Sequence, residues 1–247
     1  MKRVFLITGA SGELGKSFVK NIDSKEIVYK FSRSELSDNS DNKCFILDLL
    51  EEEKVKEVLE LTDLDSFNEI VLIHTVGKFK FENDESKIED KDGDGIDDEI
   101  YKTNVITTKN ILKYVKQNIN GRAEIKVCVF ASVSDKYSIP YWSSYTRAKN
   151  ILRGYLQTLS ENQIVSALVV NVSTVDTGNE NLLRPNADKT YWLKPEEIVT
   201  RVLPELNDLD GYTEIDIIKE HPDFKKDYYI NHESILEKWH SEMREVE

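Results

Sequence analysis

The sequence predicts an α/β fold in which a doubly wound parallel sheet of about seven strands forms a single domain. Short apolar runs alternate with longer helical stretches along the chain, and several of the runs are apolar almost throughout. Strands that are covered by helices on both faces have this composition. No linker rich in Pro, Gly or Ser divides the 247 residues, and 39% of them are hydrophobic, which suits one sizeable core.

Each element follows from its own stretch of sequence. Strands are predicted where short segments are rich in β-branched and aromatic residues, at 3–8, 26–31, 43–47, 69–74, 124–131, 164–171 and 213–218. Helices are predicted where apolar residues recur at helical spacing, near 13–21, 51–61, 98–117, 143–161 and 195–206. Beyond residue 219 the chain leaves this alternation, and 233–245 is expected to form a terminal helix with a short apolar stripe.

The chain carries a net charge of −13 at pH 7. Nucleic acids and anionic membranes attract clusters of Lys and Arg, so we expect neither as a partner. The sequence has no run of about 18 apolar residues and enters a strand at once, so we expect a cytoplasmic protein without a transmembrane span or signal peptide. An anionic cofactor remains compatible, because a helix N-terminus binds phosphate locally whatever the total charge.

The first predicted strand runs directly into a loop with glycines at three-residue spacing, Thr8-Gly9-Ala10-Ser11-Gly12-Glu13-Leu14-Gly15. Gly9 permits a tight turn, Gly12 lets the backbone approach a pyrophosphate, and Gly15 lets the following helix pack closely on the strand. The phosphate would lie at the helix N-terminus. Because the loop follows a strand at the start of a βαβ unit, it predicts dinucleotide binding rather than an ordinary glycine turn.

Three side chains are suited to the reduction of a carbonyl group. Tyr145 and Lys149 are four residues apart and share one face of a predicted helix, and Ser132 ends the preceding strand. Hydride transfer to a ketone leaves an alkoxide-like oxygen, which Tyr145 can protonate and Ser132 can bind. A free tyrosine has a pKa near 10, so titration near neutrality needs about 3 pKa units, or roughly 4 kcal/mol, of phenolate stabilisation, expected from Lys149. The alternative is a solvated helical pair.

Residues 3–218 resemble the short-chain dehydrogenase/reductase family. The residues that carry the resemblance occur in the family's order, as the glycine loop 8–15, Asp48-Leu49, Gly77, Asn104, Ser132, Tyr145 and Lys149. The resemblance implies a Rossmann domain over 1–218 that contains the catalytic site, with 219–247 as an extension packed on it. It also implies that Tyr145 is the acid/base, Lys149 its activator and ribose ligand, Ser132 the carbonyl polariser and Asn104 the support of a proton-relay water.

The resemblance further implies a site for NADP, with NAD as the alternative. Cofactor contacts are expected from Gly9, Ser11, Gly12, Glu13, Leu14, Gly15, Ser32, Arg33, Asp48, Leu49, Thr75, Val76, Gly77, Tyr145, Lys149, Ser173, Val175 and Thr177. No acidic residue ends the second strand, and Arg33 can pair with a 2′-phosphate, which favours NADP over a reading of Arg33 as a solvated loop residue. Asp48 is expected to border the adenine, to cap the next helix, or both.

The predicted function is hydride transfer between NADP(H) and a small carbonyl or alcohol substrate, and the resemblance implies a homodimer or homotetramer. Three sequence features depart from the family pattern. His74-Thr75-Val76-Gly77 replaces the usual Asn-x-Ala-Gly, Val172-Ser173 replaces Pro-Gly, and the glycine spacing is similar to that of the sugar-nucleotide-modifying branch. His74 is expected to be structural. Two alternatives stay open, a sugar-nucleotide epimerase or dehydratase with a reduced substrate domain and a non-catalytic NADP(H)-binding regulatory protein.

The acidic stretch 90–99 imitates a calcium-binding loop. Acidic residues alternate from Asp90, and Gly95 stands at the sixth position, but the twelfth position holds Tyr101 rather than Glu. A solvated acidic turn is favoured, in which Asp97 or Asp98 caps the following helix, and no metal is predicted.

Two further groups of residues carry expectations about packing. Cys44 and Cys128 are expected to be reduced core residues about 19 Å apart, four strand spacings, too far for a disulfide. An aromatic group flanks the catalytic run and the loop after the sixth strand, and consists of Tyr137, Tyr141, Trp142, Tyr191 and Trp192. Core or dimer packing explains such a group, and so does the wall of a substrate pocket.

Overall fold

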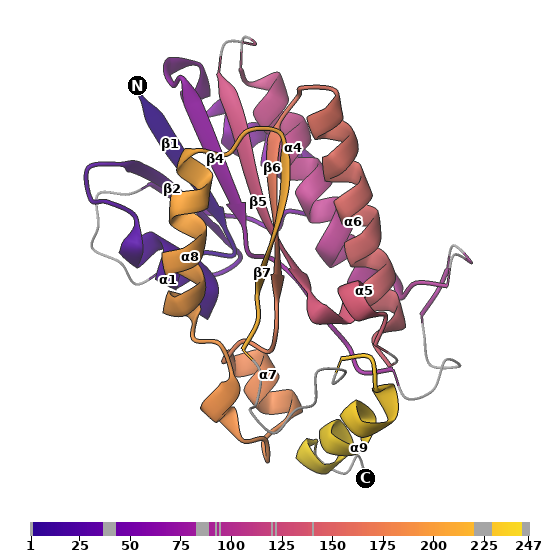
Figure 1. The fold of residues 1–247 in the computed structure, drawn as a ribbon. Helices are drawn as coiled ribbons and strands as arrows, with labels where there is room; N and C mark the ends of the chain where they lie inside the picture. Colours follow the sequence, from indigo (N-terminus) through magenta and orange to yellow (C-terminus); the bar gives the residue numbers. More distant parts are fainter. Residues whose placement is uncertain are drawn as a thin grey trace.

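Seven parallel strands form one sheet in the order β3-β2-β1-β4-β5-β6-β7 (Figure 1). The computed structural model describes residues 2–36, 43–82, 89–91, 93, 95–119, 121, 123–139, 141–219 and 229–243. The strands are β1 (Arg3–Thr8), β2 (Ile27–Ser32), β3 (Lys43–Ile46), β4 (Glu69–His74), β5 (Glu124–Ser132), β6 (Ser166–Val172) and β7 (Tyr212–Ile217). The predicted fold class is confirmed, and each strand lies within two residues of its predicted position.

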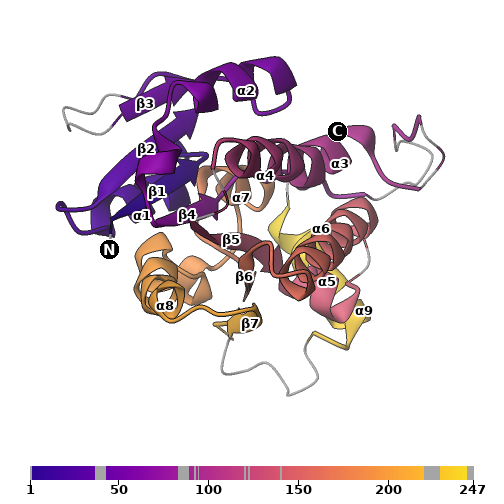
Figure 2. The ribbon, with the colours of Figure 1, turned by 90° about the horizontal axis from the view of Figure 1, so that it is seen from above.

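Helices cover both faces of this sheet (Figure 2). They are α1 (Glu13–Asn21), α2 (Glu52–Glu60), α3 (Asp98–Tyr101), α4 (Thr107–Gln117), α5 (Val133–Tyr137), α6 (Ser143–Glu161), α7 (Gly178–Leu183), α8 (Pro195–Asn207) and α9 (His232–Glu242), with single 3-10 turns at Leu64–Ser66 and Lys189–Tyr191. α2, α4 and α6 pack on one face, and α1 and α8 pack on the other. Within the described part of the chain, no helix is long and apolar enough to cross a membrane.

Strand β1 shows why the predicted strands are apolar almost throughout. Val4 and Leu6 belong to the core under α2, α4 and α6, whereas Phe5 and Ile7 belong to the core under α1 and α8. Successive side chains of a strand point to opposite faces, so a strand with helices on both faces buries every residue. An uninterrupted apolar run therefore indicates that β1 lies in the middle of the sheet.

The helix predicted at 98–117 is interrupted at the residue that the family resemblance singles out. It consists of α3, a π-helical turn at Lys102–Ile106 and α4, and Asn104 lies inside the π turn. A π turn inserts one residue into a helix and often marks a functional position. The start of α3 is capped by Asp97, whose carboxylate accepts the backbone N–H groups of Glu99 and Ile100, as expected for one of the two candidate caps.

Two short helices at the carboxyl ends of the strands, α5 and α7, were not predicted from the sequence. Figure 1 shows α7 and α9 at this end of the molecule, beyond the sheet. α9 packs on the domain through Trp239, whose ring lies 5.4 Å from that of Trp142. Its predicted range extended to residue 245, and residues 244–247 lie outside the described part of the chain.

The prediction that both cysteines are core residues is wrong for Cys44. Cys128 is buried in β5, but Cys44 is exposed, and both are free thiols. β3 is an edge strand with most of its side chains exposed, so its apolar character does not imply burial on both faces. The predicted separation stands, because β2, β1 and β4 lie between the two strands.

The contact between α1 and the glycine loop yields a stability prediction. A methyl group on Gly15 would lie 2.3 Å from the carbonyl oxygen of Gly9, a backbone atom that cannot move aside. We expect Gly15→Ala to destabilise the fold by about 2–3 kcal/mol, as overpacked cores do. The matched control is Gly154→Ala on the exposed side of α6, where the added methyl group would meet nothing within 4 Å beyond its own helix backbone and where alanine should add about 0.5–1 kcal/mol. Chemical denaturation measures both changes, and equal stabilities would contradict the close packing.

Candidate active site

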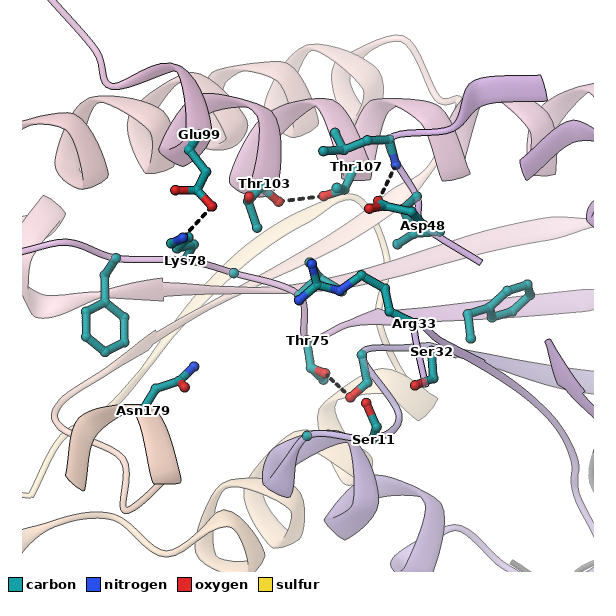
Figure 3. Close-up of a pocket in the computed structure, with 18 of the residues that line it drawn as sticks. Ser11, Ser32, Arg33, Asp48, Thr75, Lys78, Glu99, Thr103, Thr107 and Asn179 are labelled. Carbon is teal, nitrogen blue, oxygen red and sulfur yellow. Dashed lines mark hydrogen bonds and ion pairs between the residues drawn. The ribbon is translucent and has the colours of Figure 1, made fainter. Parts of the chain in front are cut away.

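A cavity of about 720 Å³ opens at the carboxyl ends of β1, β2 and β4, where the strand order reverses (Figure 3). Ten predicted cofactor residues line it, namely Gly9, Ser11, Gly12, Ser32, Arg33, Asp48, Leu49, Thr75, Val76 and Gly77. Its size falls within the range of about 300–1,000 Å³ that is usual for ligand and cofactor sites. The sequence therefore located ten of the residues around this cavity.

The glycine loop shapes one side of this cavity. Gly9 has a φ of +72°, which only glycine adopts without strain, and its carbonyl oxygen accepts the N–H of Gly12 at 2.9 Å. Gly12 is the N-cap of α1, and no side chain caps the helix there, so its first N–H groups remain available to an anion.

Within the glycine loop, three residues predicted to contact the cofactor do not line the cavity. Oε2 of Glu13 accepts the N–H of Gly178 at 2.6 Å, which ties α1 to the start of α7. Leu14 packs against the core under α1 and α8, and Gly15 meets the backbone of the glycine loop. Their roles are to hold the loop and α7 in place.

Arg33 and Asp48 contribute a cation and a carboxylate to the wall of the cavity. Arg33 follows β2 and extends into the cavity (Figure 3). Asp48, which lies four residues before the start of α2, also lines the cavity. Its Oδ1 accepts the N–H of Leu50 at 2.9 Å. Asp48 thus fixes the turn ahead of α2 rather than the first turn of that helix.

Asn104 connects the large cavity to the predicted catalytic residues. Its Nδ2 donates to the carbonyl oxygens of Lys78 at 2.7 Å and Ile100 at 2.8 Å, so it holds the chain segment that follows β4. Its Oδ1 is buried and has no hydrogen-bond partner in the described structure. A methyl group on Gly77 would lie 3.2 Å from this oxygen and 3.6 Å from Nζ of Lys149. A side chain at position 77 would crowd these two buried polar atoms, so glycine keeps the space beside them open.

A second pocket, of about 140 Å³, holds the predicted serine and tyrosine together. Ser132, Tyr145, Ser173, Val175 and Thr177 all line it. Ser132 is the last residue of β5 and the N-cap of α5, and its Oγ accepts the N–H of Ser134 at 3.1 Å. Because this oxygen is occupied as an acceptor, its hydroxyl hydrogen is available to a ligand oxygen in the pocket.

Tyr145 and Lys149 lie together on α6, as predicted. Nζ of Lys149 lies 5.2 Å from the centroid of the Tyr145 ring. Burial lowers the pKa of Lys149 to about 8, and the carboxylate of Asp135 opposes this change. Most molecules therefore carry a protonated Lys149 at pH 7.

The pKa of Tyr145 does not move in the expected direction. Burial raises it, and the nearby carboxylates of Asp135 and Glu180 raise it further. Burial and these carboxylates set the direction of the pKa change, although the ammonium of Lys149 lies over the Tyr145 ring. The phenol of Tyr145 is therefore held in its protonated form, which is the form that donates a proton.

His74 occupies a structural position, as expected. It is buried at the end of β4, where Nδ1 lies 2.8 Å from Oγ1 of Thr8 and Nε2 lies 3.2 Å from Oγ1 of Thr107. Burial lowers its pKa to about 3, and the charge of Lys149 contributes. The imidazole is therefore neutral and links β1, β4 and α4 by hydrogen bonds.

Asp135 contributes to the site and was missed in the sequence. Its Oδ1 accepts the N–H of Ser132 at 2.7 Å, and its Oδ2 pairs with Arg153 of α6. Ser132 and Asp135 together form a capping box. The Ser132 side chain accepts a backbone N–H of the first turn of α5, and the Asp135 side chain accepts the backbone N–H of Ser132. The signal was present as a Ser-x-x-Asp pattern directly after a strand.

Glu180 and Arg184 also line the small pocket and were missed. They form an ion pair at i,i+4 spacing around α7, and Arg184 makes a second ion pair with Glu242 of α9 at 3.0 Å. Oppositely charged residues four apart are typical of a helix. However, α7 is too short to show the apolar periodicity by which helices are predicted from sequence.

The aromatic group divides between the two roles considered for it. Trp142 lines the small pocket. Tyr137 stacks on Tyr229, and Tyr141 packs against Phe81. Trp192 is buried beneath Arg184, with the guanidinium carbon 5.0 Å from its ring centroid. One member is therefore pocket wall, and these three pack within the protein.

The acidic stretch 90–99 forms a turn in its described part. The Asp90 carboxylate accepts the N–H groups of Gly93 and Gly95, each at 2.7 Å. Asp92 and Asp94 lie outside the described residues, so calcium binding there stays untested. Elsewhere in the described chain, no group of three or more His, Cys, Asp or Glu side chains is arranged to hold a metal ion.

No family model and no curated protein matches the sequence, but many solved structures match the fold. An aldohexose dehydrogenase from Thermoplasma acidophilum matches with a TM-score of 0.71 at 15% identity, over 91% of this chain and 97% of that one. The chain has the short-chain dehydrogenase/reductase fold. An alcohol dehydrogenase from the archaeon Thermococcus sibiricus, complexed with 5-hydroxy-NADP, shares this fold at 23% identity, with a TM-score of 0.65 over 90% of this chain and 99% of that one.

A 4-hydroxyisoleucine dehydrogenase complexed with NADH has the same short-chain dehydrogenase/reductase fold. Its TM-score is 0.70 at 16% identity, over 90% of this chain and 100% of that one. At these identities the comparison establishes the fold alone. The expected homo-oligomer and the expected cytoplasmic location stay predictions.

The buried His74 generates a prediction about pH. Its pKa is about 3 in the folded protein and near 6.5 in an unfolded chain, so between these values only the unfolded state binds the proton. Stability from this group is complete above pH 6.5 and falls by about 1.4 kcal/mol for each unit as the pH decreases. We expect His74→Asn to remove this slope between pH 6.5 and 4.5, measured by urea unfolding at each pH. Parallel curves for the two proteins would show that His74 is not buried as a neutral ring.

Proposed function

We propose that the protein is an NADP(H)-dependent oxidoreductase that interconverts a carbonyl compound and its alcohol. The observation that carries this proposal is that Ser132 and Tyr145 line one small pocket, with the ammonium of Lys149 over the Tyr145 ring. This pocket adjoins the large cavity, since Phe79 lines both. A hydroxyl pair beside a dinucleotide-sized cavity suits the protonation of a reduced carbonyl oxygen.

The residues around the large cavity fit a dinucleotide. The start of α1 offers uncapped N–H groups to the pyrophosphate, and Asp48 borders the position of the adenine. The buried Oδ1 of Asn104 and Nζ of Lys149, both beside Gly77, would meet the nicotinamide end. When bound, the nicotinamide supplies or accepts the hydride.

The side chains of the small pocket perform the proton chemistry in this proposal. Ser132 donates its hydroxyl hydrogen to the carbonyl oxygen and polarises the C=O bond. Tyr145, held as a neutral phenol, donates its proton to the same oxygen as negative charge develops there. Lys149 then stabilises the phenolate, and its charge persists at neutral pH because its pKa is about 8.

The choice of NADP over NAD rests on Arg33. Arg33 lines the cavity directly after β2, and β2 itself ends in Ser32 rather than in an acidic residue. A 2′-phosphate would accept charge-assisted hydrogen bonds from the guanidinium, whereas a 2′-hydroxyl would need an acidic partner there. Of the solved neighbours, one is described with 5-hydroxy-NADP and another with NADH.

Removing the hydroxyl of Tyr145 tests the proposed reaction. Tyr145→Phe should lower kcat for the NADPH-dependent reduction of a ketone by about 10²- to 10⁴-fold, because the proton donor is lost. NADPH affinity, followed by fluorescence, should change less than about twofold. Tyr155→Phe on the same helix is the control, since Tyr155 packs against the core under α2, α4 and α6 and lines neither pocket. Full turnover of Tyr145→Phe would overturn the mechanism.

Substitution of Arg33 tests the cofactor. Arg33→Ala should weaken NADPH binding by about 10- to 100-fold, because a hydrogen bond to a charged group contributes about 1.5–3 kcal/mol. NADH binding should stay within about twofold. Arg201→Ala, an exposed arginine of α8 that does not line the cavity, should leave both affinities unchanged. Equal losses for NADPH and NADH in Arg33→Ala would refute the assignment of the 2′-phosphate to this residue.

A further inference from the structure

The small pocket beside Tyr145 has aromatic walls. Phe79, Trp142 and Trp239 all line it, from the segment after β4, the start of α6 and α9. The ring of Phe79 lies 6.2 Å from that of Tyr145, and the ring of Trp142 lies 5.7 Å from that of Phe79. Aromatic faces carry partial negative charge and attract cations. The walls alone therefore accept an apolar or a cationic group.

Among the described residues, two charged side chains line this pocket, Glu180 and Arg184, and Arg184 is already engaged. Its guanidinium donates to Glu180, to Oε2 of Glu242 at 3.0 Å and to Oγ1 of Thr174 at 2.7 Å. It also lies between two indole rings, 5.0 Å from Trp192 and 5.4 Å from Trp239. With 4% of its side chain exposed, Arg184 serves as a packed connector and is poorly placed to receive an anion.

Glu180, by contrast, keeps one oxygen uncommitted. Both of its hydrogen bonds from Arg184 end on Oε1, and Oε2 receives none within the described chain. Its side chain is 15% exposed, and it lies on the pocket surface that it shares with Tyr145. Burial raises the pKa of the Glu180 carboxyl group, and Arg184 opposes that change; as a carboxylate, Glu180 in turn raises the pKa of Tyr145. A carboxylate oxygen in an aromatic pocket is costly unless a donor binds it.

We propose that this pocket selects substrates that carry a protonated amine next to the reacting carbonyl or alcohol carbon, with Oε2 of Glu180 as the amine's hydrogen-bond partner. The inference rests on the proposed oxidoreductase function. A cavity of about 150 Å³ is known to hold benzene, so a pocket of about 140 Å³ suits a short amino ketone or the reacting end of a larger one. The tryptophan faces add cation–π attraction to the same ammonium group.

The step balances in the reducing direction. The carbonyl carbon of the amino ketone gains a hydride from NADPH, and its oxygen gains the proton of Tyr145. The products are the amino alcohol and NADP⁺, and Tyr145 recovers its proton from solvent. The ammonium group takes no part in the bond changes, so its effect is on binding and orientation.

Four ketones that share one small skeleton test the selection: aminoacetone, hydroxyacetone, pyruvate and 2-butanone. Following NADPH oxidation at pH 7, we expect kcat/KM for aminoacetone to exceed that for 2-butanone by at least about 10-fold, as for one charge-assisted hydrogen bond. In Glu180→Gln this ratio should fall to about 3 or less. Glu196→Gln, at an exposed position of α8, should keep the wild-type ratio. A preference for pyruvate, or equal values for all four, would overturn the inference.

A binding measurement separates this inference from the proposed function. 1-Amino-2-propanol should quench the tryptophan fluorescence of the wild-type protein, because Trp142 and Trp239 line the pocket, and 2-butanol should not. Glu180→Gln should weaken the amine's affinity by at least about 10-fold, with unchanged melting temperature and NADPH affinity as the test of folding. Absence of amine binding to the wild type would refute the amine site even if ketones are reduced. Amine binding without any ketone turnover would refute the oxidoreductase and leave the amine site standing.

Discussion

The geometry of the small pocket depends on the buried carboxylate of Asp135. It accepts the backbone N–H of Ser132 at the end of β5 and pairs with Arg153 on α6, so a strand, a short helix and a long helix meet at one side chain. Burial raises its pKa, and the hydrogen bond and charge of Arg153 oppose that change. A buried charge that loses its partner costs about 3–5 kcal/mol, so this pair constrains where the Ser132 and Tyr145 hydroxyls can lie.

The parts of the molecule that the sequence predicted are those governed by repeating backbone geometry. The strands were found because a buried parallel strand is apolar on both faces, and Gly9, Gly12 and Gly15 were found because tight turns and close packing admit few other residues. Cys44 shows the limit of that reasoning. An edge strand has the same composition over a short length, and only the sheet order reveals that one of its sides is open.

The parts that escaped prediction are governed by long-range side-chain contacts. Arg184 and Glu242 are 58 residues apart in the chain and meet only because α7 and α9 pack together. The pKa of Tyr145 was expected to decrease on account of Lys149, but burial and two carboxylates decide its direction. Those carboxylates come from α5 and α7, short helices whose local sequence carries too little periodicity to place them.

The large cavity and the small pocket are built largely by different elements of the fold. The large cavity is built mainly by the sheet ends and the glycine loop, whereas Trp239 reaches the small pocket from α9, a helix outside the sheet. Changes in α9 can therefore reshape one wall of the small pocket without altering a residue of any strand. Such a division lets ligand preference diverge among proteins of this architecture while the sheet stays the same, and it makes α9 a compact segment for the redesign of specificity.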